Sequence, residues 1–352
     1  MRRIPVSVGG DSEPSRKALR SLLFGGVTVL LFSGAGSVCA GELGHYAAGV
    51  LNIRDFFVPE PGFYYVQYHY LYSTDTLKNR NGDEVGSLTR TGRLGTTTLT
   101  VEPDVDVFAL IPTFIWVSPW QVLGARYGAY IAPTFADGSA QVDLSLAHSG
   151  RFGERGFSRS LEADTGMGVG DLLVQPLWLG WSGKHYDVSA GYGFYAPTGE
   201  EGIGLEFWTN QLQLAGAWYP FDNRGTAVTL AGTYEIQSEK QDEDLTPGDR
   251  VTLNWGVSQY LPLTKDQTWL AELGASGYSQ WQVDEDSGSD VPQIQRLNVT
   301  LNAKDEVHAA GIQGWLTFVP WKASLMVHYQ WEFGAEARFE GENLVVTLVK
   351  GF

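Results

Sequence analysis

Apolar and polar residues alternate along much of the chain, and the stretch Val169–Gly199 shows this pattern most clearly. It holds two strand-length runs joined by four polar residues, Ser182–His185. In the second run the apolar face carries Tyr186, Val188, Ala190, Tyr192 and Phe194. A period of two is the mark of a β-strand that separates an apolar from a polar environment. The stretch therefore predicts an antiparallel hairpin.

The same unit recurs along the chain and predicts twelve strands, although ten or fourteen would also fit the pattern. The hairpin in Val169–Gly199 supplies the fourth and fifth strands. The other predicted strands are Phe63–Thr74, Val101–Val117, a strand from Gln121 through Ile131, Leu205–Pro220, Thr226–Gln237, Val251–Leu263, Trp269–Val283, Val307–Val319, a strand through Leu325–Phe333 and a last strand ending at Phe352.

The connections between these strands alternate in length. Short turns of three to five residues lie near Pro119, Gly183, Asn223, Lys265 and Trp321. The connections between them are mostly longer and polar, and include Asn79–Gly95, His148–Gly166, Glu239–Asp249 and Asp284–Glu306. Outer-membrane barrels combine short periplasmic turns with longer outer loops and aromatic residues at both interfaces, such as Trp178 and Trp181 beside the first hairpin's turn. We therefore predict an all-β fold, a closed antiparallel transmembrane β-barrel over residues 62–352.

The first forty residues have the parts of a secretory signal. Basic residues precede a short apolar run, Leu22–Phe32, and small residues end at Ala40, after which we expect cleavage. The apolar run is shorter than the ~20 residues that a membrane-spanning helix needs, and a lipid anchor at Cys39 is a weaker alternative. Residues 41–61 lack clean alternation. We expect a periplasmic N-terminal segment there, or alternatively a plug inside the barrel.

The composition and net charge of the chain limit the classes of function that it can have. The chain has 43 Gly, 12 Trp, 16 Tyr and 17 Phe, and only 18% of its residues are charged, which suits strands better than helices. Removal of residues 1–40 takes away the single cysteine, five of the 24 basic and two of the 40 acidic residues, leaving a net charge of −19. This excludes thiol chemistry and a disulfide framework, and it argues against a nucleic-acid partner.

Candidate lumen residues follow from the assumption that the polar strand faces line the interior. They are Tyr65, His69, Arg126, Tyr130, Asp187, Tyr195, Glu235, Glu272, Tyr278, His328 and Glu332, and the same reasoning adds Asp104 and Asp106. An acidic lining favours cations or neutral solutes. The alternative is that these carboxylates bind water or Arg126 and select nothing. The tyrosines could bind an aromatic solute, or simply fill a narrow barrel.

Catalysis has little support in the sequence. There is no GxSxG motif, His69 and His328 are isolated, and no pair of residues has metal-ligand spacing. We therefore expect no catalytic residue, no cofactor and no metal. The acidic loops are expected to be solvated, with bound Ca²⁺ or contact with lipopolysaccharide as alternatives.

Several runs resemble the proteobacterial outer-membrane family called "MetA-pathway of phenol degradation", also described as SphA-like or transporter-like proteins. The matching runs are Gly168–Trp181, Tyr192–Gly199, Trp218–Pro220, Leu253–Leu263, Val319–Leu325 and Trp331–Gly341, with His45-Tyr46 and Asp55-Phe56 resembling the family's N-terminal pattern. The resemblance implies an outer-membrane barrel with an uptake role, encoded in some cases near the genes of aromatic-degradation pathways. It implies no catalytic residues.

We therefore predict a monomeric barrel of the cell outer membrane for passive uptake of small hydrophobic or aromatic compounds. A structural or surface-interaction barrel without a solute path is the alternative, and a barrel-embedded hydrolase is less favoured. The expected partners are outer-membrane lipid and lipopolysaccharide, the small hydrophobic solute, and the barrel-assembly machinery. The chain-terminal aromatic residue Phe352 is the predicted assembly signal for that machinery.

Overall fold

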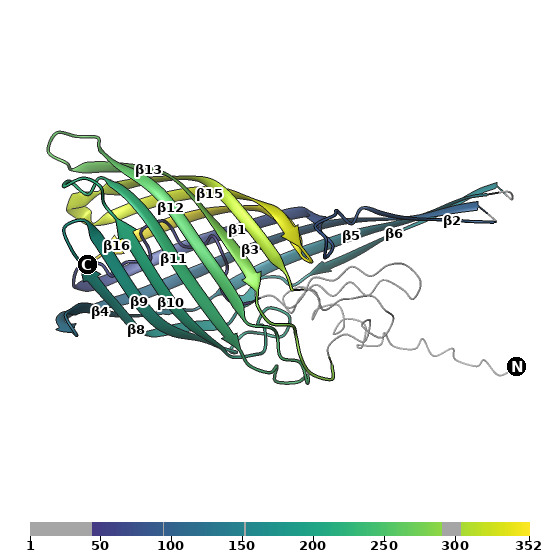
Figure 1. The fold of residues 1–352 in the computed structure, drawn as a ribbon, viewed down its shortest axis with the longest axis horizontal. Helices are drawn as coiled ribbons and strands as arrows, with labels where there is room; N and C mark the ends of the chain where they lie inside the picture. Colours follow the sequence, from purple (N-terminus) through teal and green to yellow (C-terminus); the bar gives the residue numbers. More distant parts are fainter. Residues whose placement is uncertain (1–43, 94, 151–152, 291–303) are drawn as a thin grey trace, which may run out of the picture.

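The computed structural model describes residues 44–93, 95–150, 153–290 and 304–352, so the predicted signal peptide lies outside it. The described residues form a closed antiparallel barrel of twelve strands, as predicted (Figure 1). Among these residues, no helix is long and apolar enough to cross a membrane.

Each strand of the wall pairs with both neighbours, and the ring closes where β3 pairs with β1. Around the barrel the order is β1 (Gly62–Leu77), β16 (Phe339–Gly351), β15 (Ala323–Glu336), β14 (Glu306–Phe318), β13 (Trp269–Gln282), β12 (Arg250–Pro262), β11 (Thr226–Gln237), β10 (Thr209–Trp218), β9 (Tyr186–Ala196), β8 (Leu172–Ser182), β4 (Ala125–Ala132) and β3 (Gly95–Val122). The five short turns predicted from the sequence all lie at one end, which is the periplasmic end by the usual asymmetry of such barrels, whereas the two-residue turn between β15 and β16 lies at the other end.

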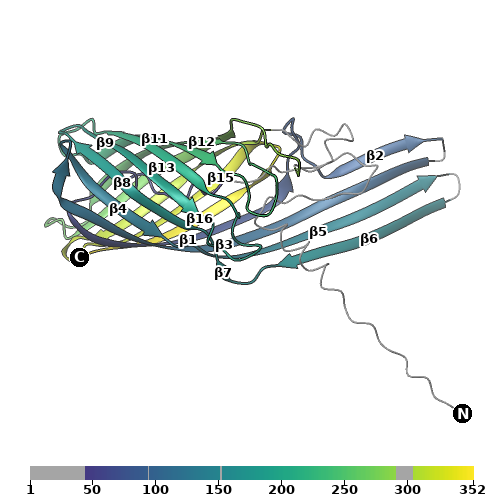
Figure 2. The same ribbon diagram turned by 90° about the horizontal axis from the view of Figure 1, so that it is seen from below.

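A four-stranded sheet projects from the opposite end (Figure 2). It consists of β2 (Ser87–Gly92), the first part of β3, β5 (Phe135–Gly150) and β6 (Gly153–Asp164), and we call it the extension. The two-residue strand β7 (Gly168–Val169) pairs with β5 at its base. Two predicted loops were therefore wrong, because Asn79–Gly95 contains β2 and His148–Gly166 contains β6. These strands were missed because polar and basic residues interrupt the apolar alternation by which the other strands were recognised, as Arg159 does between Phe157 and Leu161 in β6.

From β10 to β15 the apolar side chains face outward and the polar side chains face inward, as predicted. Exposed apolar side chains such as Leu214, Leu230 and Ile312 cover the outside. Polar side chains point inward and are buried, among them Gln211, Gln213, Thr233, Thr252, Asn254, Gln280, Gln313 and Gln330. We call this side of the interior the polar wall.

On the other side, β1 and β3 carry apolar side chains on both faces. In β3 the inward residues run Val105, Val107, Ala109, Ile111, Thr113, Ile115 and Val117, while Phe114 and Trp120 are exposed on the outside. The inward residues of β1 include Val66 and Tyr68, which are buried. We call this side the apolar wall. The barrel interior is thus polar on one side and apolar on the other.

The outward face of β3 also marks the membrane boundary. Its side chains change from Glu102, Asp104 and Asp106 to Phe108 and Leu110 within a few residues. Asp104 and Asp106 therefore lie outside the barrel, and their predicted place in the lumen was wrong. Charged side chains are costly against the hydrocarbon core, so the extension begins where these acidic residues appear.

Residues 44–61, which we call the N-terminal segment, lie inside the barrel. The side chains of Tyr46, Ala48, Val50, Ile53 and Phe56 are buried there. They pack against inward residues from several strands, including Tyr278, Val345 and Ala215. The described part of the predicted periplasmic segment therefore occupies the lumen.

Candidate functional site

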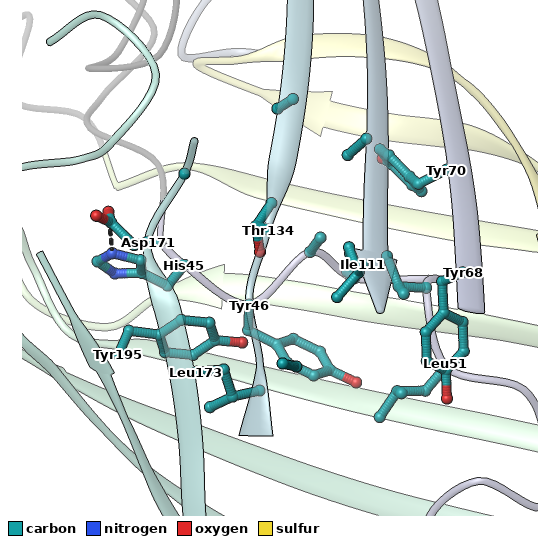
Figure 3. Close-up of a pocket in the computed structure, with 18 of the residues that line it drawn as sticks. His45, Tyr46, Leu51, Tyr68, Tyr70, Ile111, Thr134, Asp171, Leu173 and Tyr195 are labelled. Atoms are coloured by element: carbon teal, nitrogen blue, oxygen red, sulfur yellow. Dashed lines mark hydrogen bonds and ion pairs between the residues drawn. The ribbon is translucent and has the colours of Figure 1, made fainter. Parts of the chain in front are cut away.

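A cavity of about 360 Å³ lies between the N-terminal segment and the apolar wall (Figure 3). Much of its lining is aromatic or aliphatic, and includes Tyr46, Leu51, Tyr68, Tyr70, Val105, Ala109, Ile111, Tyr130, Leu173, Trp178, Tyr195 and Ile203. A concave, mostly apolar site with a few polar groups is what small-molecule binding requires. This cavity is the candidate functional site.

The N-terminal segment binds the polar wall through its backbone. The amide nitrogen of Tyr46 donates a hydrogen bond of 2.8 Å to Glu235 Oε1 on β11. The Tyr46 hydroxyl accepts one of 3.1 Å from Asn254 Nδ2 on β12. The amide of Ile53 donates to Gln313 Oε1 on β14 at 3.3 Å. Because the polar wall holds the segment, the remaining space is left along the apolar wall.

His328 on β15 forms hydrogen bonds with the middle of the segment. One ring nitrogen bonds the carbonyl oxygen of Gly49, and the other lies 2.9 Å from Asn52 Oδ1. The Asn52 amide in turn donates to Asp55 at 2.7 Å, and the Tyr68 hydroxyl donates to the same carboxylate at 2.9 Å. Burial raises the pKa of Asp55, although these donors oppose the shift. The network joins both walls through the segment.

Two ion pairs hold the periplasmic half of the segment. Arg54 Nε donates to Glu272 Oε1 on β13 at 2.8 Å, and the guanidinium lies 4.1 Å from the ring centroid of Tyr260. Nearer the end of the barrel, Arg126 Nη2 lies 2.6 Å from Glu60 Oε1. The first pair is buried, whereas the second is partly exposed and so contributes little.

His45 anchors the outer end of the segment. Its ring stacks on Tyr195 with centroids 4.7 Å apart, Nε2 lies 2.8 Å from Asp171 Oδ2, and Nδ1 lies 2.7 Å from Thr209 Oγ1. Burial raises the pKa of Asp171, but hydrogen bonds from His45 and the backbone amides of Leu205 and Gly199 outweigh it, so the pKa lies below the usual value.

His45, Asp171 and Thr209 are residue types that occur in catalytic triads, but their hydrogen bonds do not have the donor–acceptor directions that a triad requires. The Thr209 hydroxyl donates its proton to Gln237, and the Asp171 carboxylate only accepts. Both ring nitrogens of His45 therefore face acceptors, and the ring is not placed to take a proton from Thr209. The cluster ties the segment to the barrel.

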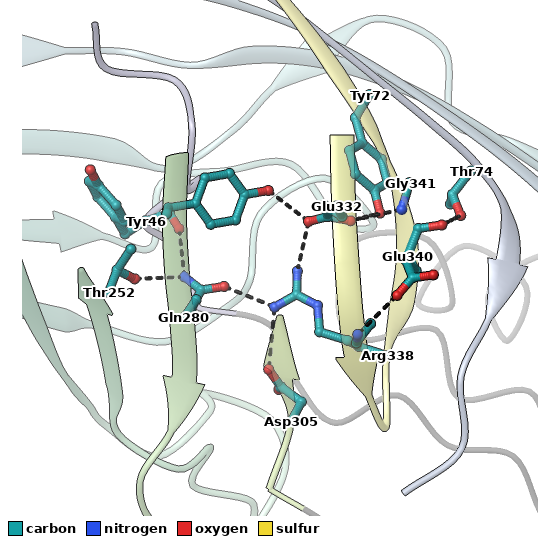
Figure 4. A network of polar contacts seen from close by, with 12 residues as sticks. Tyr46, Tyr72, Thr74, Thr252, Gln280, Asp305, Glu332, Arg338, Glu340 and Gly341 are labelled. Atoms are coloured by element: carbon teal, nitrogen blue, oxygen red, sulfur yellow. Dashed lines mark hydrogen bonds and ion pairs between the residues drawn. The ribbon is translucent and has the colours of Figure 1, made fainter. Parts of the chain in front are cut away.

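A second polar network lines the outer end of the cavity (Figure 4). Glu332 accepts hydrogen bonds from the hydroxyls of Tyr278 at 2.7 Å and Tyr72 at 2.9 Å. Arg338 lies 3.8 Å from Glu332 and 3.3 Å from Asp305. Burial raises the pKa of Asp305, but Arg250 and Arg338 outweigh it and hold the pKa below the usual range. Charge at this end of the cavity is thus paired within the protein.

The structure places nine of the eleven predicted lumen residues inside the barrel. They are Arg126, Tyr130, Asp187, Tyr195, Glu235, Glu272, Tyr278, His328 and Glu332. Tyr130 and Tyr195 line the cavity, and so do Tyr278 and Glu332. Glu235, Glu272 and His328 contact the N-terminal segment. Asp187 binds Arg224 and the Tyr219 hydroxyl.

Tyr65 and His69 were predicted in the lumen but lie on the outer face of β1. The ring of Tyr65 is 5.3 Å from that of the exposed Phe114. The inward positions of β1 are instead Val66, Tyr68 and Tyr70. The prediction took the more apolar face as the lipid-facing one, but on this wall the interior is apolar too.

Sequence reasoning also missed main cavity residues such as Tyr68 and Ile111 on this wall and Trp178 on β8. The signal that could have found them is the apolar character of both faces of residues 107–117. A strand that separates lipid from an aqueous lumen would alternate. Within the described ranges, no group of three or more His, Cys, Asp or Glu residues is arranged to hold a metal ion.

A family model described as "Putative MetA-pathway of phenol degradation" matches residues 75–348. Among solved structures, the chain is similar to an outer membrane channel from Pseudomonas putida F1, with 17% identity, a TM-score of 0.51, and coverage of 86% of this chain and 100% of that chain. It is also similar to the β-domain of the Bordetella autotransporter BrkA, with 9% identity, a TM-score of 0.44, and coverage of 83% and 100%. A Pseudomonas aeruginosa FadL homologue is 9% identical, with a TM-score of 0.34 and coverage of 83% of this chain and 90% of that chain. No curated protein matches the chain.

Proposed function

The chain belongs to the outer-membrane family described as "Putative MetA-pathway of phenol degradation", and on this basis we propose that it is a channel for passive uptake of small hydrophobic or aromatic compounds. The family name describes a pathway, so the nature of the solute is argued from the cavity. The Pseudomonas putida protein to which the chain is similar is described as an outer membrane channel, which supports this proposal.

The observation that carries the proposal is the apolar cavity beside the N-terminal segment. Its volume of about 360 Å³ exceeds that of engineered apolar cavities of about 150 Å³ that bind benzene. The rings of Tyr68, Tyr130 and Tyr195 offer faces for an aromatic solute, and their hydroxyls offer hydrogen bonds to a phenolic one. A sugar would have to leave most of its hydroxyl groups without partners there, at a high free-energy cost.

The path for the solute runs along the apolar wall, on the side of the N-terminal segment that does not bind the polar wall. The segment makes its hydrogen bonds to Glu235, Gln313 and Glu272 on the polar wall. Contacts on the cavity side are mainly apolar, apart from the hydrogen bond between Tyr68 and Asp55. Small displacements of the segment would widen this side first.

The test is the initial rate of uptake of labelled toluene, phenol and glucose by cells with and without the protein. Channel function for hydrophobic compounds predicts faster entry of toluene and phenol and unchanged entry of glucose. Equal gains for all three would indicate a general pore. Identical rates with and without the protein would contradict the proposal.

The filled lumen favours one other function, a plugged barrel that has no solute path. A variant that lacks residues 44–59 separates the two. If the segment only fills the barrel, its removal creates new conductance in planar bilayers while toluene uptake by the unmodified protein stays at background. If the channel function is right, the unmodified protein already transports toluene.

A further inference from the structure

The extension is an amphipathic sheet with one apolar face. Cross-strand partners share a face, and Leu99 on β3 pairs with Leu146 on β5, which pairs with Phe157 on β6. Two residues nearer the barrel along β3, Val101 pairs with Leu144. The opposite face is polar. There Thr100 pairs with Ser145, and Ser145 with Ser158.

The apolar face is continuous with the cavity. Strand β3 pairs without a register shift from Gly95 to Leu110 with β5 and from Val105 to Val117 with β1. Its side chains therefore keep the same alternation throughout. Leu99, Val101 and Pro103 in the extension share a face with Val105 and Val107, which line the cavity. One strand thus carries an apolar row from Leu99 to the candidate site, and within this row Val101 (3% exposed) and Val105 (7% exposed) are buried.

This face lies outside the hydrocarbon region, where apolar surface is unfavourable. The outward carboxylates Asp104 and Asp106 place the boundary at the base of the extension. About a dozen residues of β3 lie beyond it, or roughly 40 Å at 3.3 Å per residue. Side chains at the far end are exposed, with Leu146 at 43% and Phe157 at 65%. His148 lies at the tip of this face, and Arg159 lies beside Leu144 at the β6 edge, two residues nearer the barrel than Phe157. The exposed apolar surface is therefore a patch of Leu146 and Phe157 with the half-buried Leu99 and Leu144 beside them, and exposed apolar patches mark binding sites.

We propose that the extension is a capture surface that binds small apolar solutes outside the membrane and passes them along β3 into the cavity. The inference rests on the proposed uptake function and adds its entry route. The occupant is a small apolar or aromatic molecule, because the row ends in a cavity of that chemistry. Val101 and Val105 are buried, so the transfer requires the residues that cover them to move aside, and this route avoids crossing the acidic rim of Asp104 and Asp106.

The test compares two double variants in adjacent cross-strand pairs of the same two strands. Leu146→Asn/Phe157→Asn alters the apolar face, and Ser145→Asn/Ser158→Asn alters the polar face. The probe is labelled toluene, and the measurement is the initial uptake rate as a function of concentration. Surface display of both proteins is checked first.

We expect the apolar-face variant to lower uptake by about tenfold at low toluene concentration, since two large apolar contacts are lost. The maximal rate should be unchanged because the cavity is intact. The polar-face variant should behave as the unmodified protein. Equal uptake by both variants and the unmodified protein would overturn the capture role while leaving channel function in place.

Two further results would also overturn it. If the unmodified protein gives no uptake above background, the channel proposal itself fails, and the capture role fails with it. If the unmodified protein is a dimer in detergent and Leu146→Asn/Phe157→Asn makes it a monomer, the apolar face binds a second copy of the chain rather than a solute.

Discussion

Arg54 and Glu272 form a buried ion pair across the barrel interior, with Nε 2.8 Å from Oε1. The Glu272 side chain is fully buried and that of Arg54 is 13% exposed. One partner belongs to the N-terminal segment and the other to the wall. The pair therefore links the segment to the wall by a charge–charge contact, in addition to the hydrogen bonds that Glu235 and His328 make with the segment.

Removal of Arg54 should release the segment. Arg54→Ala leaves the Glu272 carboxylate buried without its cation, which typically costs about 3–5 kcal/mol. A Cys39→Ser/Ala48→Cys variant carries one thiol, and Ala48 is buried when the segment is in place. We expect Arg54→Ala to raise the rate of thiol labelling by more than about a hundredfold. Arg54→Met/Glu272→Gln should restore most of the protection, and its failure to do so would show that the charge is not the cause.

Acidification should loosen the outer end of the segment. The pKa of Asp171 in the folded protein is below its usual value of about 3.9. Its stabilising contribution is therefore complete above that value and is lost as the pH falls through the lower, folded-state pKa. We expect channel openings in planar bilayers to become more frequent as the pH falls below about 4. Asp171→Asn should open more often at pH 5 and respond less to acid, whereas an equal response would exclude this carboxylate.

Filling the cavity should block hydrophobic solutes. Ala47 is exposed within the lumen and lines the cavity, so Ala47→Trp can place an indole there without displacing packed atoms. We expect toluene uptake to fall severalfold at unchanged protein stability, because the added ring narrows the cavity in which the solute would bind. Leu214→Trp, which adds an indole on the lipid-facing side, is the matched control. Normal uptake by Ala47→Trp would place the solute path elsewhere.

The membrane boundary can be tested by charge. Leu214 is 63% exposed on the outside of the barrel, so Leu214→Arg should lower the free energy of unfolding in bilayers by about 2–4 kcal/mol if it lies near the midplane. Ser145→Arg, on the polar face of the extension, should change it by less than about 0.5 kcal/mol. Urea titration of folding into lipid vesicles measures both. A comparable loss at Ser145 would place the extension inside the hydrocarbon region.

Local sequence determined the barrel and the positions of its strands. The predicted strand Thr226–Gln237 coincides with β11, and Trp269–Val283 differs from β13 by one residue. These strands separate lipid from a polar interior, so apolar and polar side chains alternate along each of them. Alternation is a property of neighbouring residues and can be read without knowledge of the fold.

Tertiary structure decided which face of β1 and β3 points inward, what fills the lumen and where the cavity lies. Tyr65 and Tyr68 are both aromatic, and no local pattern distinguishes the lipid side from an apolar interior. Their directions are set only when the ring closes through β1 and β3 and the register of the whole barrel is fixed. The site of the N-terminal segment is likewise decided by partners distant in sequence, such as Arg54 with Glu272 and Asn52 with His328. The barrel was therefore predictable from the sequence, whereas the cavity depends on how its walls and the segment meet.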